Sequence, residues 1–162
     1  MKYTALIYDD CKDIEDSYEH LKKAMEIFTE DDECQQIVVS CKDEWLCQLA
    51  QNPISKMMLV KMAGSPYVAL LNGLKAVYQE NVIVVGLSSN CENIQVEAVK
   101  NELSQYPAIY FDKDLQGFDT RLLMFTLQMA IEINLSIDSY AQAVEKLGDT
   151  PLKYIGTAVN QS

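Results

Sequence analysis

Apolar residues follow two different spacings along the chain. Runs of adjacent apolar, β-favouring residues predict buried strands, and segments with apolar residues every three or four positions predict amphipathic helices. The predicted strands are Tyr3–Tyr8, Gln36–Val39, Met57–Val60, Asn81–Val85, Ala108–Phe111 and Leu152–Ile155. The predicted helices are Ile14–Phe28, Asp43–Gln51, Ser65–Tyr78, Glu92–Leu103, Asp119–Ile133 and Ser139–Leu147.

The order of these elements predicts the fold class. Ser65-Pro66 provides an N-cap serine and a proline at the first helical position, and Gly148 provides a C-terminal cap. Strands that alternate with helices form βαβ units, which build a mostly parallel sheet covered by helices on both faces. We therefore expect one three-layer α/β domain over residues 1–162.

Composition narrows the function classes. The chain carries 13 Lys and Arg against 24 Asp and Glu, a net charge of −11, and Arg121 is its single arginine. Nucleic-acid binding and binding to anionic lipid both need a basic face, so neither is expected. The six glycines are fewer than the roughly eleven that average usage would give, which argues against a glycine-rich phosphate loop.

The five cysteines and the apolar runs bear on location. The cysteines are odd in number and show no CxxC spacing, which favours a reducing cytoplasm over a disulfide framework or a zinc site. No apolar run reaches the roughly 18 residues of a membrane-spanning helix, and the first residues do not resemble a signal peptide. We expect a cytoplasmic protein.

Acidic residues gather after the first predicted strand. Asp9, Asp10 and Asp13 follow it, at the sheet edge where α/β proteins bind ligands, and carboxylates there could hold Mg²⁺. Alternatively, Asp13 caps the next helix and its neighbours favour the positive helix end, the interpretation that we prefer. The run Glu30–Glu33 is expected to be a solvated surface turn.

Two small turns follow predicted strands and form a candidate pocket. Gly64 and Ser65 precede one helix, and Gly86, Ser88 and Ser89 follow the most strand-like run. Helix N-termini expose unpaired amides, so a nucleotide or a small phosphorylated ligand could bind there, although helix initiation explains the first turn equally well. The turns would be neighbours if their strands were adjacent.

Two single residues have both a functional and a plain interpretation. His20, the only histidine, lies just off the apolar stripe of its helix, so we expect a solvated surface residue rather than a catalytic base. Cys91 lies near a helix N-terminus, which can lower a thiol pKa, but no general base lies beside it in the sequence. The cysteines are expected to pack as small apolar residues.

Three stretches, in order, resemble the 2-C-methyl-D-erythritol 4-phosphate cytidylyltransferase family. Residues 69–76 and 81–85 are similar to its Gly-Gly-x-x-Arg-x-x-Ser-Val-x-x-Gly-Leu helix and to the strand that ends in His-Asp-x-x-Arg-Pro. Residues 115–123 are similar to its Thr-Pro-Gln-x-Phe segment. Residues 138–141, 145–148 and 154–156 are similar to its Thr-Asp-Asp-Ala segment, glycine turn and Val-x-Gly strand.

The resemblance implies a Rossmann-like nucleotidyltransferase fold and a definite chemistry. The family transfers CMP from CTP to a sugar-alcohol phosphate with Mg²⁺ and releases pyrophosphate. This chain departs from the pattern where that chemistry is carried: no glycine or arginine forms a phosphate loop after Tyr8. Pro66 replaces the arginine of the Gly-Gly helix, Ala69 its serine, Gly86 the metal-binding aspartate, and Ser89 the second arginine.

Two further departures concern substrate and assembly. Asp138-Ser139 reverses the family's substrate-binding Thr-Asp order. Between Cys91 and Leu115 only a helix and a strand are predicted, where the family carries a long β-arm that helps to build its dimer. We therefore do not expect an arm-mediated dimer.

These departures leave three hypotheses. The first is a catalytically inactive cytidylyltransferase-like protein, without a cofactor, that binds a ligand or a protein partner or self-associates. The second is an active nucleotidyltransferase with Mg²⁺ relocated to Asp9, Asp10 or Asp13 and with phosphate held around Gly64 and Gly86. The third is a structural or regulatory partner of a full-length relative.

Overall fold

The computed structural model describes residues 1–10 and 17–156. Its strands are β1 (Tyr3–Tyr8), β2 (Cys34–Cys41), β3 (Met57–Lys61), β4 (Asn81–Gly86), β5 (Ala108–Asp112), β6 (Leu115–Asp119) and β7 (Lys153–Tyr154). Its helices are α1 (Ser17–Glu30), α2 (Asp43–Ala50), α3 (Pro66–Ala76), α4 (Asn93–Leu103), α5 (Thr120–Glu132) and α6 (Tyr140–Leu147). Asp13 and the predicted helix start at Ile14 lie outside the described residues.

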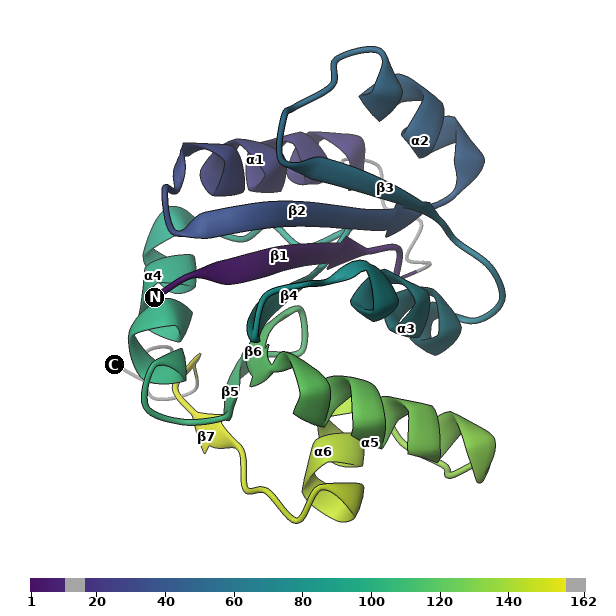
Figure 1. Ribbon diagram of the computed structural model, residues 1–162, viewed down its shortest axis with the longest axis vertical. Coiled ribbons are helices and arrows are strands. Elements are labelled where there is room, and N and C mark those ends of the chain that lie inside the picture. The colour runs from purple at the N-terminus through teal and green to yellow at the C-terminus, as the bar shows by residue number, and fades with distance from the viewer. Residues whose placement is uncertain (11–16, 157–162) are drawn as a thin grey trace.

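The strands form one 7-stranded sheet in the order β3-β2-β1-β4-β6-β5-β7 (Figure 1). β1 pairs in parallel with both β2 and β4, and β2 pairs in parallel with β3. β6 runs antiparallel to β4 and to β5, whereas β7 is parallel to β5. The expectation of a mostly parallel α/β sheet is confirmed.

The sequence did not predict β6. Gln116 and Gly117 interrupt its apolar pattern, so the segment lacks the signal of a buried strand. The structure explains the glycine: a Cβ at Gly117 would lie 2.7 Å from Val99 Cγ1 and 3.2 Å from Leu103 Cδ2. Close packing of α4 on this strand therefore requires a residue without a side chain.

Helices cover both faces of the sheet (Figure 1). Alternate residues of β1 face opposite sides, as the two-residue repeat of a strand requires. Ile7 packs in a cluster with residues of α1 and α4, and Leu6 packs in a cluster with residues of α3, α5 and α6. Among the described residues, no helix is both long and apolar enough to cross a membrane.

The helix ends follow the signals in the sequence. Ser65 Oγ accepts a hydrogen bond from Val68 N, and Pro66 is the first residue of α3, as predicted. Gly148 follows the last residue of α6 as its C-cap. Asp119 caps α5 because its carboxylate accepts a hydrogen bond from Leu122 N at 3.0 Å.

Lys100 of α4 joins the acidic turn after α1 to the rest of the core. Its side chain is 7% exposed, and its Nζ lies 2.9 Å from Asp31 Oδ2, 2.8 Å from Glu33 Oε1 and 3.2 Å from Glu97 Oε1. The Tyr3 hydroxyl donates to the same Asp31 oxygen at 2.6 Å. The expectation that the turn is merely solvated is therefore wrong for Asp31, because its partner comes from far away in the sequence.

This network sets the charge states of the turn. Partial burial opposes ionisation of Asp31, but hydrogen bonds from Tyr3 and Lys100 outweigh it and lower its pKa. Hydrogen bonds from Lys100 and from the amino terminus lower the pKa of Glu33. A lowered folded-state pKa stabilises the fold above the unfolded value of about 4, and this contribution is lost as the pH falls through the folded-state value.

Replacing Lys100 by methionine should lower the free energy of unfolding at pH 7 by about 3 kcal/mol, because Asp31 loses its buried cation. Urea unfolding measures this change. The difference from wild type should shrink below about pH 4, where the carboxylates become protonated in both proteins.

Lys75→Met provides the matched control, because Lys75 is exposed near the end of α3. It should change stability by less than about 0.5 kcal/mol. Equal effects of the two substitutions would contradict the assigned role of Lys100.

Candidate functional site

A hollow opens where β1 and β4 end and the turn between β5 and β6 begins. We call it the edge hollow. Its volume is about 390 Å³, and its lining residues are Tyr8, Asp10, Pro66, Tyr67, Lys113, Asp114, Asp138, Ser139 and Tyr140. The carboxyl edge of parallel strands is the usual ligand-binding position in α/β proteins.

Asp10 fits against the loop that follows β4. Ser88 Oγ donates to Asp10 Oδ2 at 2.5 Å, and the Leu87 N–H donates to the Tyr8 carbonyl at 2.8 Å. A Cβ at Gly86 would lie 2.7 Å from Asp10 Oδ2 and 3.6 Å from Asp114 Oδ1. The glycine therefore gives these carboxylates the space beside the end of β4.

His20 ties α1 to the same loop. Its Nδ1 lies 2.8 Å from the Ser88 carbonyl oxygen, and a carbonyl only accepts, so Nδ1 carries the hydrogen. Lys23 Nζ, one turn further along the helix, donates to Asn90 Oδ1 at 3.0 Å. His20 is half-buried, so the expectation of a solvated surface residue is wrong.

Asp9 and Asp10 have different neighbours. Asp9 is buried, and its N–H donates to the Ser40 carbonyl at 2.8 Å. Burial, followed by the charge of Asp9, raises the pKa of the Cys41 thiol to about 12, which places Asp9 near that core residue. In residues 1–10 and 17–156, no group of three or more His, Cys, Asp or Glu is arranged to hold a metal ion.

The first predicted turn, with Gly64 and Ser65, is not brought beside the turn at Gly86. β3 and β4 are separated by β2 and β1, so Gly64 and Ser65 are not brought beside Gly86 by adjacent strands. Gly64 has φ +77°, a conformation that glycine adopts readily, and Ser65 is occupied as the helix cap. The chain reaches the edge hollow only with the next residues, Pro66 and Tyr67.

The second turn does adjoin the edge hollow. Gly86 N–H donates to the Asp114 carbonyl at 3.0 Å, and Ser88 bonds to Asp10. The Ser89 N–H donates back to the Gly86 carbonyl at 2.9 Å, so it holds the turn rather than facing outward. The two predicted turns thus do not form one pocket.

The edge hollow is acidic. Among its described lining residues, three side chains are carboxylates, from Asp10, Asp114 and Asp138, and one is the Lys113 ammonium. Burial and the charges of Asp10 and Asp114 raise the pKa of Tyr8. Sequence reasoning missed Asp114 because it missed β6, whose turn with β5 carries this residue.

The cysteines of residues 1–10 and 17–156 are buried in the core, with one exception. Cys91 is 2% exposed, and burial raises its pKa to about 11, so it is a core residue rather than a nucleophile. Cys34 and Cys41 are also buried. Cys47 is exposed on α2, contrary to expectation, and Cys11 lies outside the described residues.

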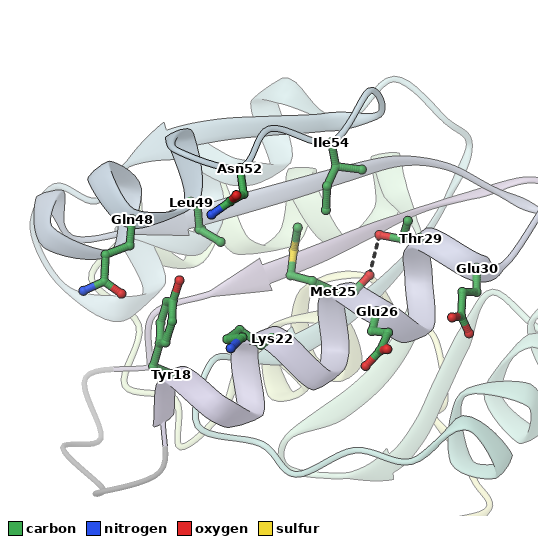
Figure 2. Close-up of a pocket in the computed structure, with 10 residues that line it drawn as sticks. All are labelled: Tyr18, Lys22, Met25, Glu26, Thr29, Glu30, Gln48, Leu49, Asn52 and Ile54. Atoms are coloured by element: carbon green, nitrogen blue, oxygen red, sulfur yellow. Dashed lines mark hydrogen bonds between the residues drawn. The ribbon is translucent and has the colours of Figure 1, made fainter.

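A second pocket, which the sequence did not predict, opens between α1 and the segment from α2 to β3. Tyr18, Met25, Leu49 and Ile54 are among its lining residues (Figure 2), and its volume is about 470 Å³. Its polar lining residues are Lys22, Glu26, Thr29, Glu30, Gln48 and Asn52. Thr29 already donates to the Met25 carbonyl at 2.6 Å, so that hydroxyl proton is in use.

Comparison with known proteins relies on the fold, because no family model and no curated protein matches the sequence. A 4-diphosphocytidyl-2C-methyl-D-erythritol synthase from Anaerococcus prevotii superimposes with a TM-score of 0.77 at 13% identity, over 95% of this chain and 88% of that one. The protein has a cytidylyltransferase fold.

Two further solved structures have the same fold. The 2-C-methyl-D-erythritol 4-phosphate cytidylyltransferase of Francisella tularensis has a TM-score of 0.73 at 14% identity, over 95% of this chain and 90% of that one. The enzyme of Thermus thermophilus has a TM-score of 0.72 at 16% identity, over 96% and 88%. The resemblance inferred from the sequence is thus confirmed at the level of the cytidylyltransferase fold.

Replacing Ser88 by alanine should lower the free energy of unfolding by about 1–2 kcal/mol, because the Asp10 carboxylate loses a short hydrogen bond in a half-buried position. Chemical denaturation measures the loss. Ser104→Ala is the control, because its hydroxyl bonds only to Asn101 O in an exposed helix end. A Ser88→Ala protein as stable as the control variant would refute the coupling.

Proposed function

We propose that this chain is a cytidylyltransferase-fold protein that does not transfer nucleotides and instead works as a binding module through its edge hollow. The observation that carries the proposal is the acidic lining of that hollow. Among the described residues, the place where a parallel sheet offers a ligand site carries Asp10, Asp114 and Asp138 together with Lys113.

Nucleotidyl transfer needs the opposite charge. The developing negative charge on the transferred phosphoryl group is stabilised by Arg, Lys, Mg²⁺ or backbone N–H groups. Carboxylates near the entering triphosphate repel it unless a metal intervenes. An acidic hollow therefore favours a ligand other than CTP.

Several backbone groups at this edge cannot donate to a phosphate. Pro66 has no N–H, and the Val68 N–H at the start of α3 is bonded to Ser65 Oγ. The Gly86 N–H is bonded to the Asp114 carbonyl. The sequence from Asp9 to Asp16 contains neither glycine nor arginine that could supply a phosphate loop.

The resemblance supports the same proposal. Gly86 stands where the family's metal-binding aspartate is expected, and Pro66 and Ser89 stand where its arginines are expected. Loss of one donor of this kind typically lowers turnover by about 100- to 1,000-fold. We infer that several such losses together leave no useful catalysis.

Incubation with CTP, Mg²⁺ and a panel of sugar-alcohol phosphates should release no pyrophosphate above background. An active cytidylyltransferase of the same fold, assayed in parallel, provides the positive control. Metal-dependent release faster than about 0.1 s⁻¹, which lies below ordinary enzyme turnover, would overturn the proposal.

One observation favours the alternative, an active enzyme with a relocated metal. The Asp10 and Asp114 carboxylate oxygens lie 2.7 and 3.6 Å from the point where a Cβ at Gly86 would stand. Carboxylates from two other segments thus occupy the surroundings of the expected aspartate. In this alternative they would hold Mg²⁺ together with the phosphates of CTP.

Thermal unfolding separates the two functions. Under our proposal, CTP with Mg²⁺ does not change the melting temperature of the wild-type protein or of Asp10→Asn. Under the alternative, the wild type is stabilised and Asp10→Asn loses that gain, whereas the control Asp32→Asn, at an exposed position, keeps it.

We infer the cellular setting from the cysteines. The cysteines in the described part of the chain are free, which supports a reducing cytoplasm. Self-association or a complex with another protein would then give the binding module its role. Size-exclusion chromatography of the purified protein distinguishes a monomer from a self-associated form.

A further inference from the structure

The outer side of α5 exposes apolar side chains to solvent. Among the described residues, eight large apolar or aromatic side chains are exposed, and three of them belong to α5 or its C-cap: Phe125 at 59%, Ile131 at 36% and Ile133 at 58%. Leu122 and Met129 of the same helix are half-buried. Apolar side chains that gather on one surface element are typical of a protein–protein contact.

These side chains surround a polar strip that points away from the core. α5 lies at the surface between α3 and α6, and its inner side packs with residues of both helices (Figure 1). An α-helix turns by about 100° per residue, so positions four, seven and eleven residues apart share one face. We call the exposed residues of that face the outer strip: Arg121, Phe125, Gln128 and Glu132.

The two charged residues of the outer strip are arranged against the helix dipole. The N-terminus of a helix carries about half a positive charge, and the C-terminus carries about half a negative charge. Arg121 is the second residue of α5, and Glu132 is its last. Each side chain therefore lies at the helix end of its own sign, where it destabilises the helix rather than supporting it.

The described part of the chain does not compensate for these charges. Within residues 1–10 and 17–156, Arg121 forms no ion pair with a carboxylate, and Glu132 forms none with a lysine or an arginine. Glu132 accepts a hydrogen bond from Gln128 Nε2 at 3.3 Å, which brings no positive charge. Two uncompensated charges at the ends of an exposed apolar face point to a partner with the opposite charges.

A second copy of α5, packed antiparallel across a two-fold axis, has those charges in the right places. With the axis between positions 126 and 127, Arg121 lies opposite the partner's Glu132, and Glu132 lies opposite the partner's Arg121. Arg121 is then also beside the negative end of the partner helix, and Glu132 beside its positive end. The arrangement that is unfavourable within one helix becomes favourable between two.

The same pairing covers the apolar side chains. Leu122 lies opposite the partner's Ile131, at the same level along the axis. The Phe125 residues of the two copies are three positions apart, which is about 4.5 Å along the axis, so their rings meet at the centre of the contact. Aromatic side chains at the centre of an interface and charges at its rim are the usual arrangement in protein–protein contacts.

We propose that the protein forms a symmetric dimer through the outer strips of two antiparallel α5 helices. A two-fold contact uses the same patch on both copies. One helix from each copy makes a small interface, so we expect a dissociation constant of about micromolar or weaker. None of the described residues that line the edge hollow belongs to α5, so the dimer does not depend on the binding function proposed above.

Sedimentation equilibrium of the full chain over a range of concentrations measures the dimer. The wild-type protein should dimerise with a dissociation constant below about 1 mM. Arg121→Glu and Glu132→Arg should each weaken self-association about tenfold or more, because each puts two pairs of like charges into the symmetric contact. Both substitutions place the introduced charge at the helix end that favours it, so the loss cannot result from a weakened α5.

An equimolar mixture of the two variants separates this contact from any other. One chain then carries an acid at both positions and the other carries a base at both, so every charge in the mixed dimer faces its opposite. We expect the mixture to dimerise about as strongly as wild type. Glu26→Arg, an exposed charge reversal on α1 at the other face of the sheet, is the matched control and should leave the dimer unchanged.

Three outcomes overturn the inference. The first is a wild-type protein that remains monomeric up to about 1 mM. The second is self-association that Arg121→Glu and Glu132→Arg leave as strong as wild type, which would place the contact on another surface. The third is a mixture of the two variants that associates no more than either variant alone.

Discussion

The central strand β1 is the constraint on which the rest of the structure depends. All six of its residues are buried, because it pairs with β2 on one side and β4 on the other while helices cover both faces. Its direction fixes where Tyr8 and Asp10 emerge. The loop after β4 and the turn before β6 then have to meet at that point, since β6 pairs directly with β4.

Local patterns predict what local forces determine. The apolar runs of β1, β2 and β4, and the Ser65-Pro66 start of α3, are all visible in the sequence and are confirmed. These elements are set by burial and capping within a few residues of chain. The antiparallel β6 is not determined in this way. Its Gly117 allows close contact with α4, and glycine itself does not favour a strand.

Contacts between distant residues account for the remaining errors. Nothing near Asp31 in the sequence indicates that Lys100 will pair with it, and nothing near His20 indicates the Ser88 carbonyl. The candidate site also contains both predictable and unpredictable residues. Asp10 and Gly86 could be placed at the sheet edge from the sequence, whereas Asp138 and Tyr140 reach it only through the crossover that leads to α6.

The close fit between Gly86 and Asp10 also restricts how this protein can change over generations. An aspartate at position 86, as the resemblance expects, would bring its Cβ to 2.7 Å from Asp10 Oδ2. Asp10 Oδ2 is the end of a side chain, so an aspartate at position 86 would be accommodated if Asp10 turned away and gave up its bond to Ser88. We therefore expect the effects of substitutions at positions 10 and 86 to be coupled rather than additive.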